Sequence, residues 1–219
     1  MIKAVIFDLD GVIIESAGIK TRAFETLFAD YPDRLPEIIS YHQKQAGISR
    51  YIKFRYFYEK ILGKKLSAQE EAKLGERFSQ IVVSQILEAP FVAGAIKFLT
   101  QNKNRYHFFI ASGTPEAELQ YIVSRRQLDK FFVEIHGAPK DKTDIIKDIL
   151  DKYALQRKDA VFIGDAESDR VAAERAGILF IARLTGENHQ LKDCQWKVND
   201  FTDLDSFMQN IYSKGAIKK

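Results

Sequence analysis

Two aspartates stand one residue apart at the end of an apolar segment near the start of the chain. Residues 4–7 are Ala-Val-Ile-Phe, and Asp8, Leu9, Asp10 and Gly11 follow directly. The apolar run predicts a buried strand, and a tight turn at Gly11 would present both carboxylates at its end. Unpaired carboxylates are costly there, so a metal ion or a proton-transfer role would account for the pair. A turn that merely ends a strand is the competing interpretation.

A second polar segment consists of Ser112, Gly113 and Thr114. It follows an apolar strand predicted for residues 107–111 and precedes a helix predicted for residues 115–125. Ser112 and nearby backbone N–H groups would suit an anion, aided by the helix N-terminus. From these residues alone, Ser112 could equally be an ordinary helix cap.

Two lysines, Lys140 and Lys142, precede and open a helix predicted for residues 142–153. A lysine at a helix N-terminus opposes the helix dipole, which suggests that one of them points toward a phosphate or a carboxylate. A solvated lysine is the alternative for either residue. A fourth segment brings Asp165 and Asp169 to the end of another predicted strand, and such hard oxygen ligands suit Mg²⁺. Asp169 alone could cap the helix that follows.

Short apolar runs alternate with amphipathic stretches throughout the second part of the chain, which predicts a parallel sheet with helices on both faces. In such a sheet the four polar segments lie on one edge, so their joint occurrence is more telling than any one of them. The strands are expected at residues 4–7, 107–111, 132–135, 160–163 and 179–182.

Residues 16–88 have a different texture, with apolar residues at helical spacing and no strand-like run. Ser67 and Glu70 form a capping-box pattern that opens a long helix, and a further helix is expected within residues 36–46. We therefore expect an all-helical cap domain at 16–88, inserted into a Rossmann-like α/β core formed by residues 1–15 and 89–219, with hinges near residues 15–18 and 88–94.

The bulk composition excludes several classes of protein. The chain has 219 residues, and its net charge of +3 comes from scattered lysines and arginines, which argues against nucleic-acid binding. A single cysteine, Cys194, excludes a disulfide within the chain. No apolar run approaches the ~20 residues that span a membrane. We expect a cytoplasmic protein, monomeric or homodimeric, with a loose tail after residue 213.

Taken together, the four segments resemble the motifs of the haloacid dehalogenase superfamily, in its helical-cap branch of phosphoglycolate phosphatases and β-phosphoglucomutase-like enzymes. The resemblance covers nearly the whole chain. The segments that carry it are Asp-Leu-Asp-Gly-Val-Ile (8–13), Ala-Ser-Gly-Thr-Pro (111–115), Gly-Ala-Pro-Lys-Asp-Lys (137–142) and Gly-Asp-Ala-Glu-Ser-Asp (164–169).

This resemblance implies a role for each residue. Asp8 is the expected nucleophile, which forms an aspartyl phosphate, and Asp10 is the acid and base. Ser112 would hold a phosphoryl oxygen, and a lysine with Mg²⁺ would offset the repulsion between nucleophile and phosphate. The expected Mg²⁺ ligands are Asp8, the backbone carbonyl of Asp10, Asp165 and Asp169. Expected substrate contacts are Gly11, Gly113, Thr114, Arg50 and Lys140.

Four details refine the expectation. Lys142 is preferred as the active-site lysine because it lies nearer the helix, although relatives with a Lys-Pro-x-Pro motif favour Lys140. Asp10 favours phosphoryl transfer, since related dehalogenases lack this second aspartate.

Glu15 replaces an aspartate common in the family and is expected to alter a hinge or a substrate contact. Arg50 lies in a segment that resembles a cap loop of sugar-phosphate mutases and would bind the far end of a substrate, or else be an exposed residue at a helix start.

The resemblance therefore implies a Mg²⁺-dependent phosphatase that hydrolyses a small phosphorylated metabolite, such as a sugar phosphate or phosphoglycolate. A phosphomutase of the β-phosphoglucomutase type is the alternative, because it would use the same aspartyl phosphate. A non-catalytic binding protein on this scaffold is a third possibility, although it would have no need of Asp10.

Overall fold

The computed structural model describes residues 1–186 and 191–213, so the tail expected to be loose lies outside the described residues. Within them, six strands form one parallel sheet in the order β3-β2-β1-β4-β5-β6. The first strand therefore lies in the middle, with β2 and β4 as neighbours. The strands are β1 (Ala4–Phe7), β2 (His107–Pro115), β3 (Phe132–Ala138), β4 (Ala160–Gly164), β5 (Leu179–Arg183) and β6 (Lys197–Val198).

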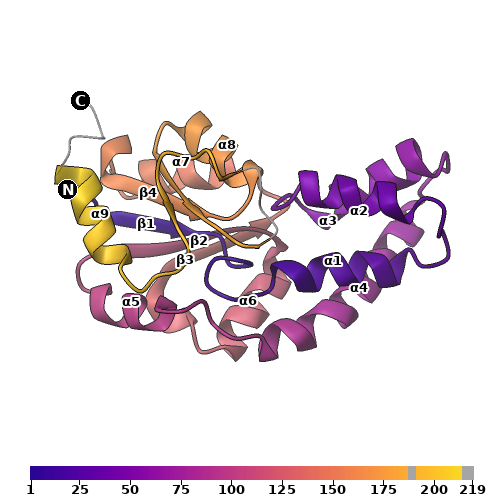
Figure 1. Cartoon of the computed structure of the whole chain (residues 1–219), viewed down its shortest axis with the longest axis horizontal. Coiled ribbons are helices and arrows are strands. Elements are labelled where there is room, and N and C mark those ends of the chain that lie inside the picture. Colours follow the sequence, from indigo (N-terminus) through magenta and orange to yellow (C-terminus); the bar gives the residue numbers. More distant parts are fainter. Residues whose placement is uncertain (187–190, 214–219) are drawn as a thin grey trace.

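Helices cover both faces of the sheet, which confirms the expected α/β architecture (Figure 1). One face packs against α7 (Lys142–Lys152) and α8 (Glu167–Ala176). The other packs against α5 (Ala95–Asn102), α6 (Glu116–Arg125) and α9 (Leu204–Ser213). Both faces of β1 are buried by these layers, and this is why its residues form a continuous apolar run.

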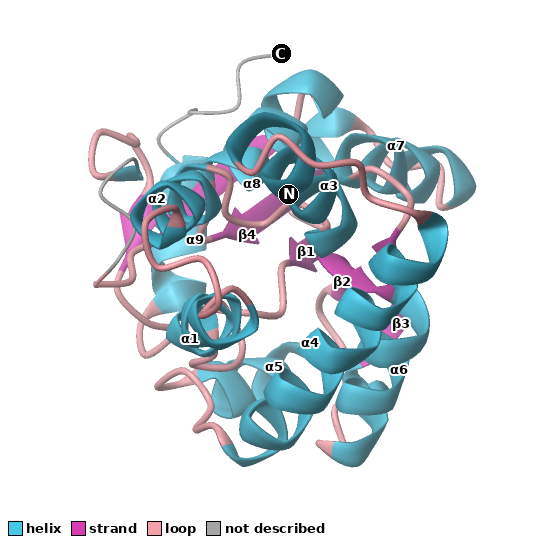
Figure 2. Ribbon diagram, turned by 90° about the vertical axis from the view of Figure 1, so that its right-hand side faces the viewer, coloured by secondary structure: helices cyan, strands magenta, loops and turns pink. Residues whose placement is uncertain are grey.

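A helical insert lies between β1 and β2, beside the carboxyl ends of the strands (Figures 1 and 2). The Ser67 side chain accepts a hydrogen bond from the Glu70 N–H, and the Glu70 carboxylate accepts one from the Ser67 N–H. The expected capping box therefore opens α4. The interior of the insert is rich in phenylalanine, with the Phe24 and Phe78 rings 4.7 Å apart. The insert contains α1 (Ala17–Leu27), α2 (Leu35–Lys44), α3 (Arg50–Tyr56), the π-helical segment η1 (Phe57–Ile61) and α4 (Ala68–Glu88).

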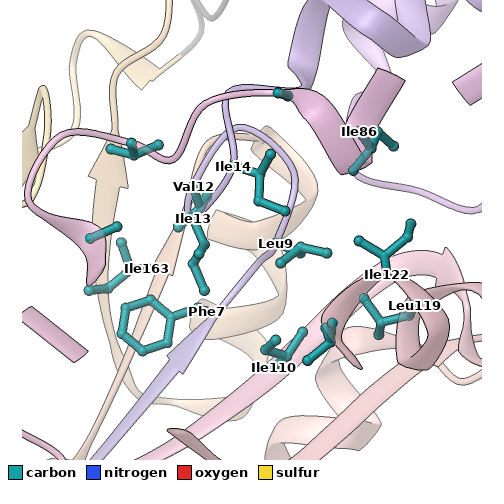
Figure 3. Close-up of a cluster of buried hydrophobic side chains, with 14 of the residues drawn as sticks. Phe7, Leu9, Val12, Ile13, Ile14, Ile86, Ile110, Leu119, Ile122 and Ile163 are labelled. Carbon is teal, nitrogen blue, oxygen red and sulfur yellow. The ribbon is translucent and has the colours of Figure 1, made fainter. Parts of the chain in front are cut away.

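The chain enters and leaves the insert along two segments that are bonded side by side. The Glu15 N–H donates to the Pro90 carbonyl at 2.9 Å, and the Val92 N–H donates to the Ile13 carbonyl at 3.0 Å. Ile13 and the apolar residues around it are buried among side chains of β2, α4 and α6 (Figure 3). The turn that follows β1 is therefore anchored by hydrophobic packing on both sides.

The structure differs from the sequence expectation at the ends of several elements. β2 continues through the polar segment to Pro115, which precedes α6 as its N-cap rather than lying in its first turn. Ser112 is consequently no helix cap. β6 was not anticipated, because two residues are too few to show an alternating pattern. Two short 3₁₀ segments, η2 (Asp129–Phe131) and η3 (Arg157–Asp159), precede β3 and β4.

Candidate active site

Asp8 follows β1 directly and is almost fully buried at the centre of the sheet edge. Its Oδ1 accepts a hydrogen bond from the Leu9 N–H at 2.7 Å, and its Oδ2 accepts one from Lys142 Nζ at 2.8 Å. Both oxygens are thus oriented by donors from the chain. In a parallel sheet of this order, the point where connections depart to opposite sides of a central strand is a common ligand site.

Lys142, the first residue of α7, joins two of the carboxylates. Its Nζ lies 2.8 Å from Asp8 Oδ2 and 2.6 Å from Asp169 Oδ1. Burial alone would lower the pKa of Lys142, but the adjacent Asp169 and Asp8 raise it above its usual value. Asp169 also accepts the Ala166 N–H at 3.0 Å, so it caps α8 and holds the lysine at once.

Asp165 completes a cluster of three acidic side chains. One oxygen from each of Asp8, Asp165 and Asp169 lies within 4.8 Å of the others. Burial, followed by repulsion from Asp8 and Asp169, raises the pKa of Asp165 well above its usual range. Burial also raises the pKa of Asp169 to about 6, although Lys142 opposes this.

The cluster fits a magnesium ion on chemical grounds. Lys142 contacts two of the three carboxylates, those of Asp8 and Asp169, and a divalent cation would relieve the mutual repulsion within the cluster. Carboxylate oxygens are also the ligands that Mg²⁺ prefers. Gly11 allows the cluster to be this close: its φ is +72°, and a Cβ there would lie 2.0 Å from Asp165 Oδ2.

Asp10 lies next to this cluster and has its own set of donors. Its Oδ1 accepts from Ser16 Oγ at 2.6 Å, and its Oδ2 accepts from Lys20 Nζ at 2.5 Å and from Thr114 Oγ1 at 3.1 Å. Burial would raise the pKa of Asp10, but Lys20, together with the Ser16 and Thr114 hydroxyls, holds it below its usual value. Asp10 is therefore ionised in this arrangement.

The polar segment at the end of β2 lies on the other side of Asp8 from β4. Ser112, Gly113 and Thr114 all line the same cavity as Asp8 and Asp10. Ser112 is buried, and its Oγ accepts the Thr114 N–H at 3.3 Å. The structure thus brings together the predicted residues of the first, second and fourth segments.

The two candidate lysines are separated by the structure. Lys142 lies within the carboxylate cluster, whereas Lys140 is exposed and forms an ion pair with Asp148 of α7. Asp141, between them, caps α7 by accepting the Thr143 N–H at 2.8 Å. The two lysines therefore lie in different surroundings, and the one nearer the helix, Lys142, is the one beside the carboxylates.

A loop of the insert covers the site. Ser168 Oγ, in the first turn of α8, donates to the Ala46 carbonyl of the insert at 2.8 Å. Gly47 follows with φ +79°, and a Cβ there would meet Ser168 Oγ at 2.3 Å. The insert loop therefore packs so closely on the edge of the sheet that a side chain at residue 47 would have to displace Ser168.

Between the insert and the strand ends lies a cavity of about 250 Å³. Its wall on the sheet side carries Asp8, Asp10 and Asp165, and its wall on the insert side carries several basic side chains. The lining residues of the insert that are basic or neutral donors include Lys20, Thr21, His42, Lys44, Arg50 and Lys53.

Arg50 lines the cavity, but its guanidinium is engaged by other groups. It forms a buried ion pair with Glu118 of α6 and donates to Ser79 Oγ of α4 at 2.9 Å. Its Cζ also lies 4.5 Å from the centre of the Phe78 ring. Arg50 thus bridges the insert and the α/β core, and its contact with a substrate stays a prediction.

Glu15 pairs with Arg183 at the end of β5, and the same guanidinium donates to the Gly11 carbonyl at 3.1 Å. The residue in which the chain departs from the family motif therefore ties the hinge to the turn that carries Asp8 and Asp10. The expected effect of Glu15 on a hinge or a substrate contact stays a prediction.

Sequence reasoning missed four polar residues of the cavity: Lys20, Thr21, His42 and Lys53. Lys20 had a readable signal, because it lies one helical turn after Ser16 and shares its face of α1. His42 is buried and also lines the cavity. Nothing in the sequence indicates that Glu118 pairs with Arg50.

Comparisons with known proteins agree with this geometry. The chain is 24% identical over 205 residues to phosphoglycolate phosphatase 1 of Pseudomonas aeruginosa, covering 85% of this chain and 71% of the relative. It is 24% identical over 196 residues to a phosphorylated carbohydrates phosphatase of Thermotoga maritima, covering 87% and 88% of the two chains. The structure of β-phosphoglucomutase from Clostridium difficile is similar over the full length of both chains, with a TM-score of 0.81 and 23% identity.

The part of the chain that the structure describes contains no helix long and apolar enough to cross a membrane. The model of one family, the haloacid dehalogenase-like hydrolases, matches residues 2–177, a span that includes all four polar segments. Because this match extends over most of the chain and agrees with the sheet and its carboxylate edge, the protein belongs to the haloacid dehalogenase-like hydrolase family.

Proposed function

We propose that this protein is a magnesium-dependent phosphatase that hydrolyses a small phosphorylated metabolite through an aspartyl phosphate on Asp8. The observation that carries the proposal is the contact of Asp8 with Lys142, inside the cluster completed by Asp165 and Asp169. A buried carboxylate held by one ammonium beside a cation site is what attack on an anionic phosphate requires.

In the first step, an oxygen of Asp8 forms a bond to phosphorus as the bond to the ester oxygen breaks. Asp10 is ionised in the free site, so it must take up a proton from solvent as the anionic phosphate enters, and it then gives this proton to the departing alkoxide. In the second step, Asp10 takes a proton from water, and the resulting hydroxide displaces Asp8 from phosphorus. Phosphate is released, and both aspartates return to their starting forms.

The surrounding residues have supporting roles. Lys142 holds Asp8 in place and offsets the charge of the phosphoryl group, and Ser112 donates to a phosphoryl oxygen. Asp8, Asp165 and Asp169 would hold Mg²⁺, which when bound neutralises the negative charge of phosphate and carboxylates. The insert loop at Gly47 covers the cavity and keeps bulk water out.

Small phosphate esters are favoured as substrates by the cavity of about 250 Å³. The phosphatases named above, which act on phosphoglycolate and on phosphorylated carbohydrates, support the same class. Their low identity to this chain does not select one compound.

The test is release of phosphate from p-nitrophenyl phosphate by the purified protein with Mg²⁺. We expect Asp8→Asn to abolish turnover while leaving the melting temperature within a few degrees of the wild type. Turnover that survives this substitution would refute Asp8 as the nucleophile. The same assay with glucose 1-phosphate, followed by product analysis, separates hydrolysis from phosphoryl transfer to the sugar.

A further inference from the structure

A second basic group lines the cavity on the side of the insert, away from the carboxylate cluster. Lys53 of α3 is buried, and its Nζ lies 2.9 Å from His42 Nδ1 and 3.4 Å from the His42 carbonyl oxygen. His42 Nε2 in turn lies 3.1 Å from Thr21 Oγ1. All three residues line the cavity described above.

The hydrogen bonds of this group fix its donors. If the ammonium of Lys53 donates to Nδ1, the neutral imidazole carries its hydrogen on Nε2 and donates it to Thr21 Oγ1. The hydroxyl hydrogen of Thr21 is then available for another acceptor. Lys53 has three ammonium hydrogens and two neutral acceptors, both on His42, so it also has a donor to spare.

Lys53 differs from the other cations in and next to the cavity that are shielded from solvent; Lys44, which also lines the cavity, is exposed. Lys142 contacts Asp8 and Asp169, Lys20 contacts Asp10, and Arg50 contacts Glu118. The acceptors that the structure describes for Lys53 are neutral. Among the described lining residues, those of the insert include no aspartate or glutamate.

A buried ammonium without a counter-charge is unfavourable. Burial, followed by repulsion from Lys20 and Lys142, lowers the pKa of Lys53 well below its usual value. An anion in the cavity would reverse this effect, because it would supply the missing counter-charge and accept the spare hydrogens of Lys53 and Thr21.

We propose that Lys53 and Thr21 bind a second anionic group of the substrate, at the end remote from the phosphoryl group, and that His42 positions the Lys53 ammonium. The inference rests on the proposed function for the identity of the first group. It assigns the substrate to phosphate monoesters that carry a further carboxylate or phosphate, since both offer anionic oxygens to an ammonium and a hydroxyl.

The experiment measures binding by calorimetry in the Asp8→Asn protein with Mg²⁺, which prevents turnover. Two matched pairs of ligands separate the sources of the second anion. In the first pair, 3-phosphoglycerate has a carboxylate where glycerol 3-phosphate has a hydroxymethyl group. In the second, glucose 1,6-bisphosphate has a phosphate where glucose 1-phosphate has a hydroxyl group.

We expect the two-anion member of at least one pair to bind more tightly than its partner, and Lys53→Met to weaken that member by about 10- to 100-fold, the usual value of a charge-assisted hydrogen bond. The pair that responds identifies the second anion as carboxylate or phosphate. Lys60→Met, at an exposed position of the insert, is the matched control and should retain the wild-type preference.

Lys53→Gln separates the effect of the Lys53 charge from a purely structural role of the side chain, because glutamine keeps a polar hydrogen-bond donor at this position. We expect it to lose the preference as Lys53→Met does, and recovery by glutamine would indicate a structural role instead. Equal binding within both pairs, or a preference unchanged in Lys53→Met, would overturn the inference. The two failures are distinguishable: the proposed function fails if the wild type releases no phosphate from any ester or if Asp8→Asn retains turnover, whereas the binding comparison tests only the second anion site.

Discussion

Lys20 Nζ lies 2.5 Å from Asp10 Oδ2, so a cation of the helical insert bonds directly to a carboxylate of the turn after β1. Thr114 contacts both partners, at 3.0 Å from Lys20 Nζ and 3.1 Å from Asp10 Oδ2. The turn after β1, the helix α1 and the distant strand β2 therefore meet at one carboxylate. The protonation state and the orientation of Asp10 depend on where the insert lies.

Replacing Lys20 by methionine tests this dependence. Lys20→Met removes the donor shared by Asp10 and Thr114, and we expect kcat/KM for an alkyl phosphate to fall by about 10- to 100-fold. Arg22→Met, an exposed position of the same helix, is the matched control. An unchanged kcat/KM in Lys20→Met would show that Asp10 needs no cation from the insert.

The two lysines around Asp141 provide a second matched pair. Lys142→Met leaves Asp8 and Asp169 without their shared cation, so we expect kcat with p-nitrophenyl phosphate to fall by at least about 100-fold. Lys140→Met removes only a surface ion pair with Asp148, and its kcat should match the wild type. The opposite ranking in steady-state assays would assign the active-site lysine to Lys140.

A methyl group at Gly47 should hold the insert loop away from the site. Gly47→Ala would bring its Cβ to 2.3 Å from Ser168 Oγ, at a φ of +79°. Gly63→Ala has a similar φ of +63° but open space around the Cβ, so both variants share the cost of about 1 kcal/mol in backbone strain. We expect the two to melt at similar temperatures and only Gly47→Ala to lose kcat/KM; equal activity would show that the loop contact is dispensable.

Magnesium should stabilise the fold, because it would neutralise the three clustered carboxylates. At about 100 times its dissociation constant, a ligand of the native state adds about 2.7 kcal/mol, which raises the melting temperature by about 5–11 °C for a chain of this size. Asp165→Asn should remove most of this rise, and Asp148→Asn, at an exposed position, should keep it. A full magnesium response in Asp165→Asn, measured by calorimetric melting, would place the ion elsewhere.

His42 predicts how stability depends on pH. Burial, followed by repulsion from Lys53 and Lys20, lowers the pKa of His42 to about 2, so this side chain stays neutral in the folded protein. In the unfolded chain, His42 binds a proton below about pH 6.5. The contribution of His42 to the stability of the fold is therefore intact above that pH and is lost as the pH falls toward the pKa of His42 in the folded protein. By linkage the loss from pH 6.5 to pH 5 is about 2 kcal/mol.

The measurement compares urea unfolding of the wild type and His42→Gln at pH 5 and pH 7.5. Because the other groups titrate in both proteins, the difference between their pH slopes isolates His42. We expect the wild type to lose more stability between the two pH values than the variant does. Parallel slopes would mean that His42 becomes protonated in the folded protein.

Much of the fold could be predicted because its signals are local. The apolar run of β1, the Ser67–Glu70 cap and the strand–helix alternation depend on neighbouring residues, and each corresponds to an observed element. Asp8, Asp165 and Asp169 could be grouped as well, because parallel strands bring their carboxyl ends to one edge.

The remaining features depend on how the insert meets the sheet, and no local pattern records that. Arg50, whose contact with a substrate stays a prediction, also contacts Glu118, a residue 68 positions further along the chain. Lys53 and His42 read as ordinary positions on amphipathic helices. Their importance follows from the absence of a counter-charge among the described lining residues, which is a property of the assembled cavity.

The paired hydrogen bonds between Glu15 and Pro90 and between Ile13 and Val92 have a mechanical consequence. Because the two connecting segments are hydrogen-bonded to each other, they act as one hinge. The insert can rotate about this hinge but cannot translate along it. Departure of the insert would then break the contacts of Lys20, Arg50 and Ala46 with the core together. Exchange of the cavity's contents with solvent would then require a single cooperative opening of the insert, with one free-energy cost, and not separate local openings.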